Sequence, residues 1–145
     1  MLLVKDLLEG KAREVWSIEP QATVHRALEL MAEKNVGALP VVEGGRLVGM
    51  ISERDHARKV TLKGKSSLAT SVREVMSSPV IMVSLDTTIE QCMGLVTTQR
   101  VRHLPVMENG QLIGIVSIGD ILKATITDQQ VLIQDLENFI TGARR

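Results

Sequence analysis

Two copies of a Ser-x-x-Asp motif carry the polar groups of this chain that are best placed to do chemistry. Ser52 and Asp55 follow one apolar segment, and Ser117 and Asp120 follow another 65 residues later. At the start of a helix, a serine hydroxyl and the unpaired backbone N–H groups attract a phosphate. A carboxylate one turn along can accept hydrogen bonds from both hydroxyls of a ribose. The motifs therefore predict a sugar-phosphate ligand.

The same spacing is also typical of a helix capping box, in which the serine caps the helix and the acid reaches back to the serine N–H. The box prefers Glu or Gln at the later position, and Asp is shorter. One such motif by itself favours capping. Two copies at equivalent places favour a ligand, so both interpretations stay open here.

The motifs belong to an internal repeat. Positions 36–55 and 101–120 are identical at 10 of 20 places without a gap. Such similarity indicates two copies of one supersecondary unit that pack as a pseudo-symmetric pair.

Each repeat has the pattern of a β-α-β-β-α unit, so the predicted fold class is α/β (α+β) with pseudo-two-fold symmetry. Short β-prone segments lie at 14–18 and 80–84, and helical apolar stripes follow Thr23 and Thr88, which are candidate caps. Two strands joined by a glycine-containing turn follow, at 38–42 and 47–51 and again at 103–107 and 112–116. The closing helices are expected to begin at Glu53 and Ile118.

The predicted organisation is one composite domain. Residues 1–62 form the first repeat with a lead-in helix, 63–71 a polar linker, 72–125 the second repeat, and 126–145 a C-terminal helix and tail. In that tail Leu132, Leu136, Phe139 and Ile140 form an apolar stripe that Gly142 is expected to end. Packing on its own domain and docking on a second subunit are equally compatible with this stripe.

The composition argues against several classes of function. Lys and Arg total 17, as do Asp and Glu, and the only aromatic residues are Trp16 and Phe139, which argues against a nucleic-acid partner. Cys92 has no cysteine partner and lies on an apolar helical face, where a small buried residue is expected. The N-terminus lacks a signal-peptide pattern and no segment approaches membrane-spanning length, so we expect a cytoplasmic protein without a membrane partner.

Catalysis is not indicated by the residue pattern. His25, His56 and His103 have no nucleophile-elbow context, and their spacing matches no zinc motif. No phosphate-binding Gly-x-x-x-x-Gly-Lys loop is present. The candidate groups are static anchors, so we expect binding without turnover.

The Leu-Pro-Val strand, the glycine turn and the Gly-hydrophobic-hydrophobic-Ser-x-x-Asp segment together resemble a tandem CBS domain, named after cystathionine β-synthase. Both halves match, from about Val4 to Ala124, as in a stand-alone bacterial-type protein of that family. The resemblance implies two clefts that bind adenosine-containing ligands such as AMP, ADP, ATP, NAD(H) or S-adenosylmethionine, with no obligatory cofactor. It also implies a homodimer.

The resemblance assigns a role to each motif residue. Asp55 and Asp120 would hold ribose hydroxyls, and Ser52 and Ser117 would contact phosphate. Arg102 and His103, just before the second Leu-Pro-Val strand, look like phosphate or ribose contacts.

In the first repeat Gly37 and Ala38 occupy those positions and carry no charge, although their backbone could lie against an adenine. Each cleft in the family borrows from both repeats. Ala22 with Val36 would then complete the Asp120 site, and Thr87 with Val101 the Asp55 site. Because Arg102 can engage a phosphate bidentately and Gly37 cannot, we expect two unequal sites. Arg54 could partly restore the balance, although a solvated helix face is its more ordinary role.

The expected function is an adenine-nucleotide sensor whose output passes to an unknown downstream protein. The rival hypothesis is a ligand-free interaction scaffold in which both Ser-x-x-Asp motifs are only helix caps.

Overall fold

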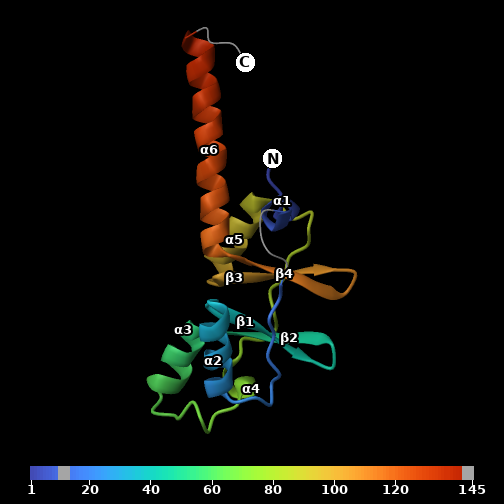
Figure 1. The fold of residues 1–145 in the computed structure, drawn as a ribbon, viewed down its shortest axis with the longest axis vertical. Coiled ribbons are helices and arrows are strands. Elements are labelled where there is room, and N and C mark those ends of the chain that lie inside the picture. The colour runs from blue at the N-terminus through green and yellow to red at the C-terminus, as the bar shows by residue number, and fades with distance from the viewer. Residues whose placement is uncertain (10–13, 142–145) are drawn as a thin grey trace. The chain divides into compact units, whose positions relative to one another are not determined.

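The computed structural model describes residues 1–9 and 14–141, which divide into two compact units (Figure 1). The first-repeat unit comprises residues 14–82 and 109–113, and the second-repeat unit comprises residues 1–9, 83–108 and 114–141. Both repeats are built on an antiparallel β-hairpin, and the α+β class predicted from the sequence is confirmed. No helix in these described ranges is long and apolar enough to cross a membrane.

The first-repeat unit packs helices on the hairpin of β1 (Ala38–Glu43) and β2 (Arg46–Ser52). Thr23 caps α2 (Val24–Lys34), since its hydroxyl accepts from the Arg26 N–H at 3.0 Å. The hairpin register pairs Ala38 with Ser52, and this places the two at the same end of the ladder. The core of this unit combines α2 and hairpin residues with Val60, Val72 and Val75.

The closing helix of the first repeat is short and irregular. It begins at Glu53 as predicted, but only α3 (Glu53–Asp55) is α-helical before the chain widens into the π-helix η1 (His56–Thr61). The linker after η1 is hydrogen-bonded to the start of α2. The Val24 N–H donates to the Thr70 carbonyl at 2.9 Å, and the His25 N–H donates to the Ser67 carbonyl at 3.0 Å.

The second repeat has the same order of elements, with α5 (Ile89–Gln99), β3 (His103–Glu108), β4 (Gln111–Ser117) and α6 (Ile118–Thr141). Cys92 is fully buried on α5, as predicted, and burial raises the pKa of its thiol. The predicted start of α6 at Ile118 is confirmed, and the helix runs unbroken to Thr141, so it continues into the predicted tail. Gly142, the expected stop, lies outside the described residues.

The predicted first strand of each repeat was wrong in extent. Residues 14–18 and 80–84 contain no named strand and contribute single parallel bridges, Ile18 with Val41 and Val83 with Val106. Pro20 lacks an N–H and cannot extend the first ladder. In the second repeat a turn begins at once, where the Ser84 N–H donates to the Thr87 hydroxyl at 3.0 Å.

The two lead-in helices are exchanged between the repeats. The lead-in of the first repeat, α1 (Val4–Glu9), belongs to the second-repeat unit, and that of the second repeat, α4 (Val72–Val75), belongs to the first-repeat unit. Equivalent backbone bonds hold them, from Val72 N–H to Ala22 O and from Val4 N–H to Thr87 O, both 2.8 Å.

A glycine in each hairpin makes room for the exchanged helix. A Cβ at Gly49 would lie 2.6 Å from Met76 Sδ, and one at Gly114 would lie 2.9 Å from Leu8 Cδ2. These glycines are the first residues of the two Gly-hydrophobic-hydrophobic-Ser-x-x-Asp segments. Glycine is needed there because a larger side chain would collide with Met76 or Leu8, which the sequence did not reveal.

Candidate functional site

The first Ser-x-x-Asp motif forms a complete capping box at the end of β2. The Asp55 N–H donates to Ser52 Oγ at 3.2 Å, and the Ser52 N–H donates to Asp55 Oδ2 at 2.9 Å. The Ser52 hydroxyl also donates to Asp55 Oδ2 at 3.1 Å. The capping interpretation is therefore confirmed for this motif.

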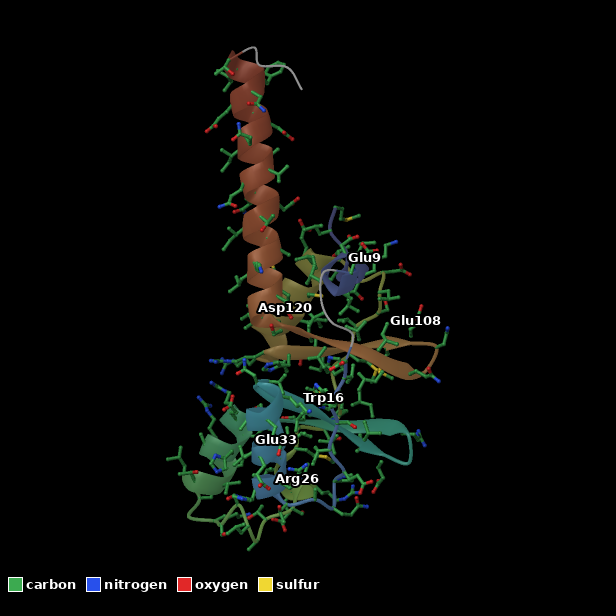
Figure 2. All side chains as sticks on the ribbon, viewed as in Figure 1. Glu9, Trp16, Arg26, Glu33, Glu108 and Asp120 are labelled. Carbon is green, nitrogen blue, oxygen red and sulfur yellow. The ribbon has the colours of Figure 1, made fainter. Side chains whose placement is uncertain are left out.

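The second motif has the same geometry at the start of α6. The Asp120 N–H donates to Ser117 Oγ at 3.1 Å, and the Ser117 N–H donates to Asp120 Oδ2 at 2.9 Å. Figure 2 labels Asp120 at the base of this helix. Because each carboxylate oxygen can accept two hydrogen bonds, a capping bond to one oxygen does not by itself exclude a ligand. Capping and ligand binding are compatible in this geometry.

A lysine that the sequence analysis missed distinguishes the first motif. Lys59 Nζ lies 3.1 Å from Asp55 Oδ1 and donates to the Val75 carbonyl at 2.9 Å. The Asp55 side chain is only 14% exposed. The equivalent position in the second repeat is Ala124, which carries no charge. An acid followed by lysine at i+4 was the available signal.

The residue before each Leu-Pro-Val strand lies directly beside its serine. The Glu53 N–H donates to the Gly37 carbonyl at 3.1 Å, and the Ile118 N–H donates to the Arg102 carbonyl at 2.8 Å. The backbone of Gly37 thus lies beside the first motif and that of Arg102 beside the second, a pairing that the sequence analysis left open. Arg102 is exposed.

Three other predicted site residues are close in sequence to these motifs or to the strands that precede them. Ala38 is buried opposite Ser52 in the hairpin, Arg54 is exposed on α3, and His103 is partly buried at the start of β3.

The predicted borrowing between repeats stays a prediction. Ala22 and Val36 belong to the first-repeat unit whereas Asp120 belongs to the second-repeat unit. Thr87 and Val101 likewise belong to the opposite unit from Asp55.

The electrostatics of the two motifs differ. Glu53 is exposed at the first position of α3, where its carboxylate opposes an incoming phosphate, and Ile118 occupies the same place in α6. An anion is therefore favoured beside Ser117 over Ser52.

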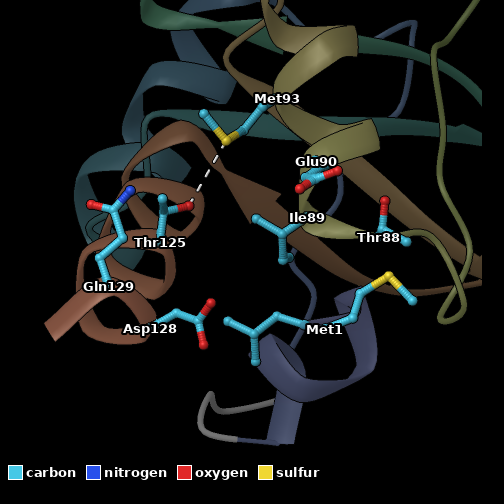
Figure 3. Close-up of a pocket in the computed structure, with 9 residues that line it drawn as sticks. Met1, Thr88, Ile89, Glu90, Met93, Thr125, Asp128 and Gln129 are labelled. Atoms are coloured by element: carbon cyan, nitrogen blue, oxygen red, sulfur yellow. Dashed lines mark hydrogen bonds between the residues drawn. The ribbon is translucent and has the colours of Figure 1, made fainter. Parts of the chain in front are cut away.

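A separate cavity of about 550 Å³ lies within the second-repeat unit (Figure 3). Residues from the N-terminus, α5 and α6 line it: Met1, Leu2, Thr88, Ile89, Glu90, Met93, Thr125, Asp128 and Gln129. None of the predicted binding residues is among them. No group of three or more His, Cys, Asp or Glu side chains suited to a metal ion occurs in residues 1–9 and 14–141.

Comparison with known proteins identifies the family. The CBS domain model matches residues 4–55 and 72–126. The CBS domain-containing protein CBSX3, mitochondrial, of Arabidopsis thaliana is 39% identical over 96% of this chain and 72% of its own length.

Solved structures show the same fold. A putative signal-transduction protein with CBS domains from Burkholderia ambifaria is 44% identical, with a TM-score of 0.84 over 88% of this chain and 96% of its own. The CBS domain pair of protein MJ0100, described in complex with 5′-methylthioadenosine and S-adenosyl-L-methionine, is similar in fold, with a TM-score of 0.78 at 23% identity over 88% of this chain and 98% of its own.

Proposed function

This chain belongs to the CBS-domain family, and we propose that it is a regulatory module that binds an adenosine-containing ligand without turning it over. A domain pair of this fold, that of MJ0100, is described with two adenosyl compounds. The mitochondrial location in the name of the Arabidopsis relative belongs to that protein, and the cytoplasmic location of this chain stays a prediction from its sequence. Ligand binding would shift a conformational or assembly equilibrium of this chain, and the output would then pass to a separate protein.

The observation that carries the proposal is the 2.8 Å bond between the Ile118 N–H and the Arg102 carbonyl. It holds the backbone of Arg102, whose side chain is exposed, against the residue that follows Ser117 at the start of a long helix, so the guanidinium is within reach of that helix start. A guanidinium, a hydroxyl and a helix N-terminus together favour a phosphate. Asp120 lies one turn along, at the spacing that suits ribose hydroxyls.

The two sites are proposed to be unequal, with the Asp120 site the stronger, because Arg102 lies where the first repeat has Gly37 and Ile118 lies where it has Glu53. Asp55 already accepts three hydrogen bonds or ion pairs, from Ser52 N–H, Ser52 Oγ and Lys59 Nζ. A ligand at Asp55 must compete with Lys59 and approach Glu53.

Titration calorimetry with AMP, ADP, ATP, NADH and S-adenosylmethionine tests the proposal. Asp120→Asn keeps an oxygen that can accept the Ser117 N–H but removes the charge, so it is expected to weaken binding about 10-fold or more, as is Arg102→Ala. Asp55→Asn is the matched variant and should have the smaller effect. Arg46→Ala removes a positive charge from the opposite end of the β1–β2 hairpin and serves as the charge control.

The scaffold hypothesis has its own support, because both capping boxes are complete. A ligand at a hundredfold excess over its dissociation constant stabilises the folded state by about 2.7 kcal/mol, which a thermal-shift measurement detects. The absence of any shift with all five compounds would favour the scaffold. Recovery of a chemically altered nucleotide would instead indicate an enzyme.

A further inference from the structure

The distal part of α6 exposes an apolar surface. From Ile126 to Thr141 every residue is exposed except Asn138, which is partly exposed. Figure 1 shows the helix continuing well beyond α5 and α1 of the same unit. Its large apolar side chains are 53–84% exposed: Ile126, Val131, Leu132, Ile133, Leu136, Phe139 and Ile140. A surface of this kind marks an interaction site.

The apolar residues follow a seven-residue repeat. Successive steps of 4, 3, 4, 3 and 4 residues connect the members of one stripe: Leu122, Ile126, Gln129, Ile133, Leu136 and Ile140. Only Gln129 in this stripe is polar. A second row, also with a spacing of seven residues, flanks one side of the stripe and consists of Thr125, Leu132 and Phe139. This spacing is that of the contact positions a and d in a two-stranded coiled coil, which indicates another helix as the partner.

The charges beside the stripe favour an antiparallel partner. Lys123, Gln130 and Glu137 flank its other side, each seven residues after the last, at position e. In a parallel pair an e residue faces a g residue of the partner, and Lys123 and Glu137 would stand about 21 Å apart along the axis. In an antiparallel pair e residues face each other, so Lys123 lies opposite the partner's Glu137. The arrangement is self-complementary about an axis near Val131, as a two-fold dimer requires.

The same register completes the apolar layers. Ile126 meets the partner's Leu136, Ile133 meets the partner's Gln129, and Ile140 meets the partner's Leu122. Two-fold symmetry makes each of these three layers occur twice. Gln129 is present only in the layer with Ile133, and the other two layers are entirely apolar.

The register also gives the cavity of the second-repeat unit an occupant. It brings the partner's Phe139 beside Thr125, which lines that cavity together with Ile89 and the 40% exposed Met93 (Figure 3). Phe139 is 84% exposed in the single chain. The apolar wall of the cavity and the exposed ring are thus complementary features of one surface.

We infer that a second copy of this chain covers α6, with the two helices antiparallel and the Phe139 ring of each copy seated in the cavity of the other. This interface is independent of the adenosine-binding proposal. It assigns the homodimer predicted from the sequence to a particular surface.

Sedimentation equilibrium tests the surface. Ile133→Asp places a charge in the stripe and is expected to weaken dimerisation at least 100-fold. Val131→Asp is the matched control, because Val131 is equally exposed (53% against 55%) but lies on the opposite side of the helix. It should leave the dimer intact. Circular dichroism verifies that both variants keep their helices. A wild-type monomer at all concentrations, or equal effects of the two variants, would overturn the inference.

A charge exchange tests the orientation. Lys123→Glu and Glu137→Lys each place like charges opposite each other twice per dimer, and each should weaken the dimer about 2- to 30-fold at low salt. The double variant K123E/E137K restores both pairs and should recover the wild-type dissociation constant. A double variant as weak as the single variants, or single variants without effect, would refute the antiparallel register. Phe139→Ala should weaken the dimer at least 10-fold, and an unchanged dissociation constant would remove the cavity from the interface.

Discussion

Replacing Gly49 with valine tests the exchange of lead-in helices. Gly49 lies buried on β2, and its missing side chain leaves room for Met76, which follows α4 of the other repeat. The three nearest atoms to a built Cβ are Met76 Sδ, Cγ and Cβ, at 2.6, 3.0 and 3.2 Å. The first distance is shorter than real Cβ contacts allow, so valine must displace this side chain.

The magnitude follows from two opposing effects. Valine in place of glycine favours a strand by about 0.5–1 kcal/mol, through backbone entropy and β-propensity. Overpacking a filled site costs about 1–3 kcal/mol. We therefore expect Gly49→Val to lower the free energy of unfolding. For a chain near this size, 1 kcal/mol changes the Tm by about 2–4 °C, so the overpacking cost alone would lower the Tm by roughly 2–12 °C. The strand preference of valine offsets part of this decrease.

A double-mutant cycle connects the loss to Met76. Truncating Met76 to alanine removes the obstructing atoms, so Gly49→Val should cost much less, or stabilise, in the Met76→Ala background. Urea unfolding of the four proteins measures the coupling free energy. A Tm for Gly49→Val at or above that of the wild type would refute the packing argument. Equal costs of Gly49→Val in the wild-type and Met76→Ala backgrounds would also refute it, because either result means that the end of α4 does not lie over this glycine.

Three further predictions concern individual residues. Gly94 lies inside α5, and a built Cβ would meet nothing within 4 Å apart from its chain neighbours and the backbone of its own helix, so Gly94→Ala should raise the free energy of unfolding by about 0.5–1 kcal/mol; a loss in urea unfolding would contradict the open position. Thr88 and Gln91 form a reciprocal capping box at 3.0 and 2.9 Å, so Thr88→Ala should cost about 1 kcal/mol while Thr88→Ser costs little; equal losses by thermal unfolding would exclude the hydroxyl as the cause. Burial raises the pKa of the Cys92 thiol, so the unfolded chain ionises at a lower pH than the folded one, and the contribution of Cys92 to the free energy of unfolding should fall as pH rises through the unfolded pKa. Iodoacetamide should then label native Cys92 far more slowly than the urea-unfolded chain, and equal rates would show that the thiol is accessible.

Local features were predictable because their causes are local. The turns at Gly44-Gly45 and Asn109-Gly110 adopt positive φ angles of 57°, 78°, 51° and 77°, which these residue types tolerate best. Thr23 and Thr88 cap the helices that follow them, and Cys92 lies buried at its helical spacing. The duplicated motif likewise predicted where each closing helix begins.

The sequence by itself determined the repeat, the hairpins, the caps and the two Ser-x-x-Asp helix starts, because each depends on residues a few positions apart. Only the tertiary structure decided that α1 and α4 change places, that Lys59 donates to the Val75 carbonyl, and that the Arg102 carbonyl accepts from the Ile118 N–H. It also decided that the stripe on α6 stays exposed. These features depend on which distant segments meet, and residue periodicity describes the apolar face of a helix without naming the surface that covers it.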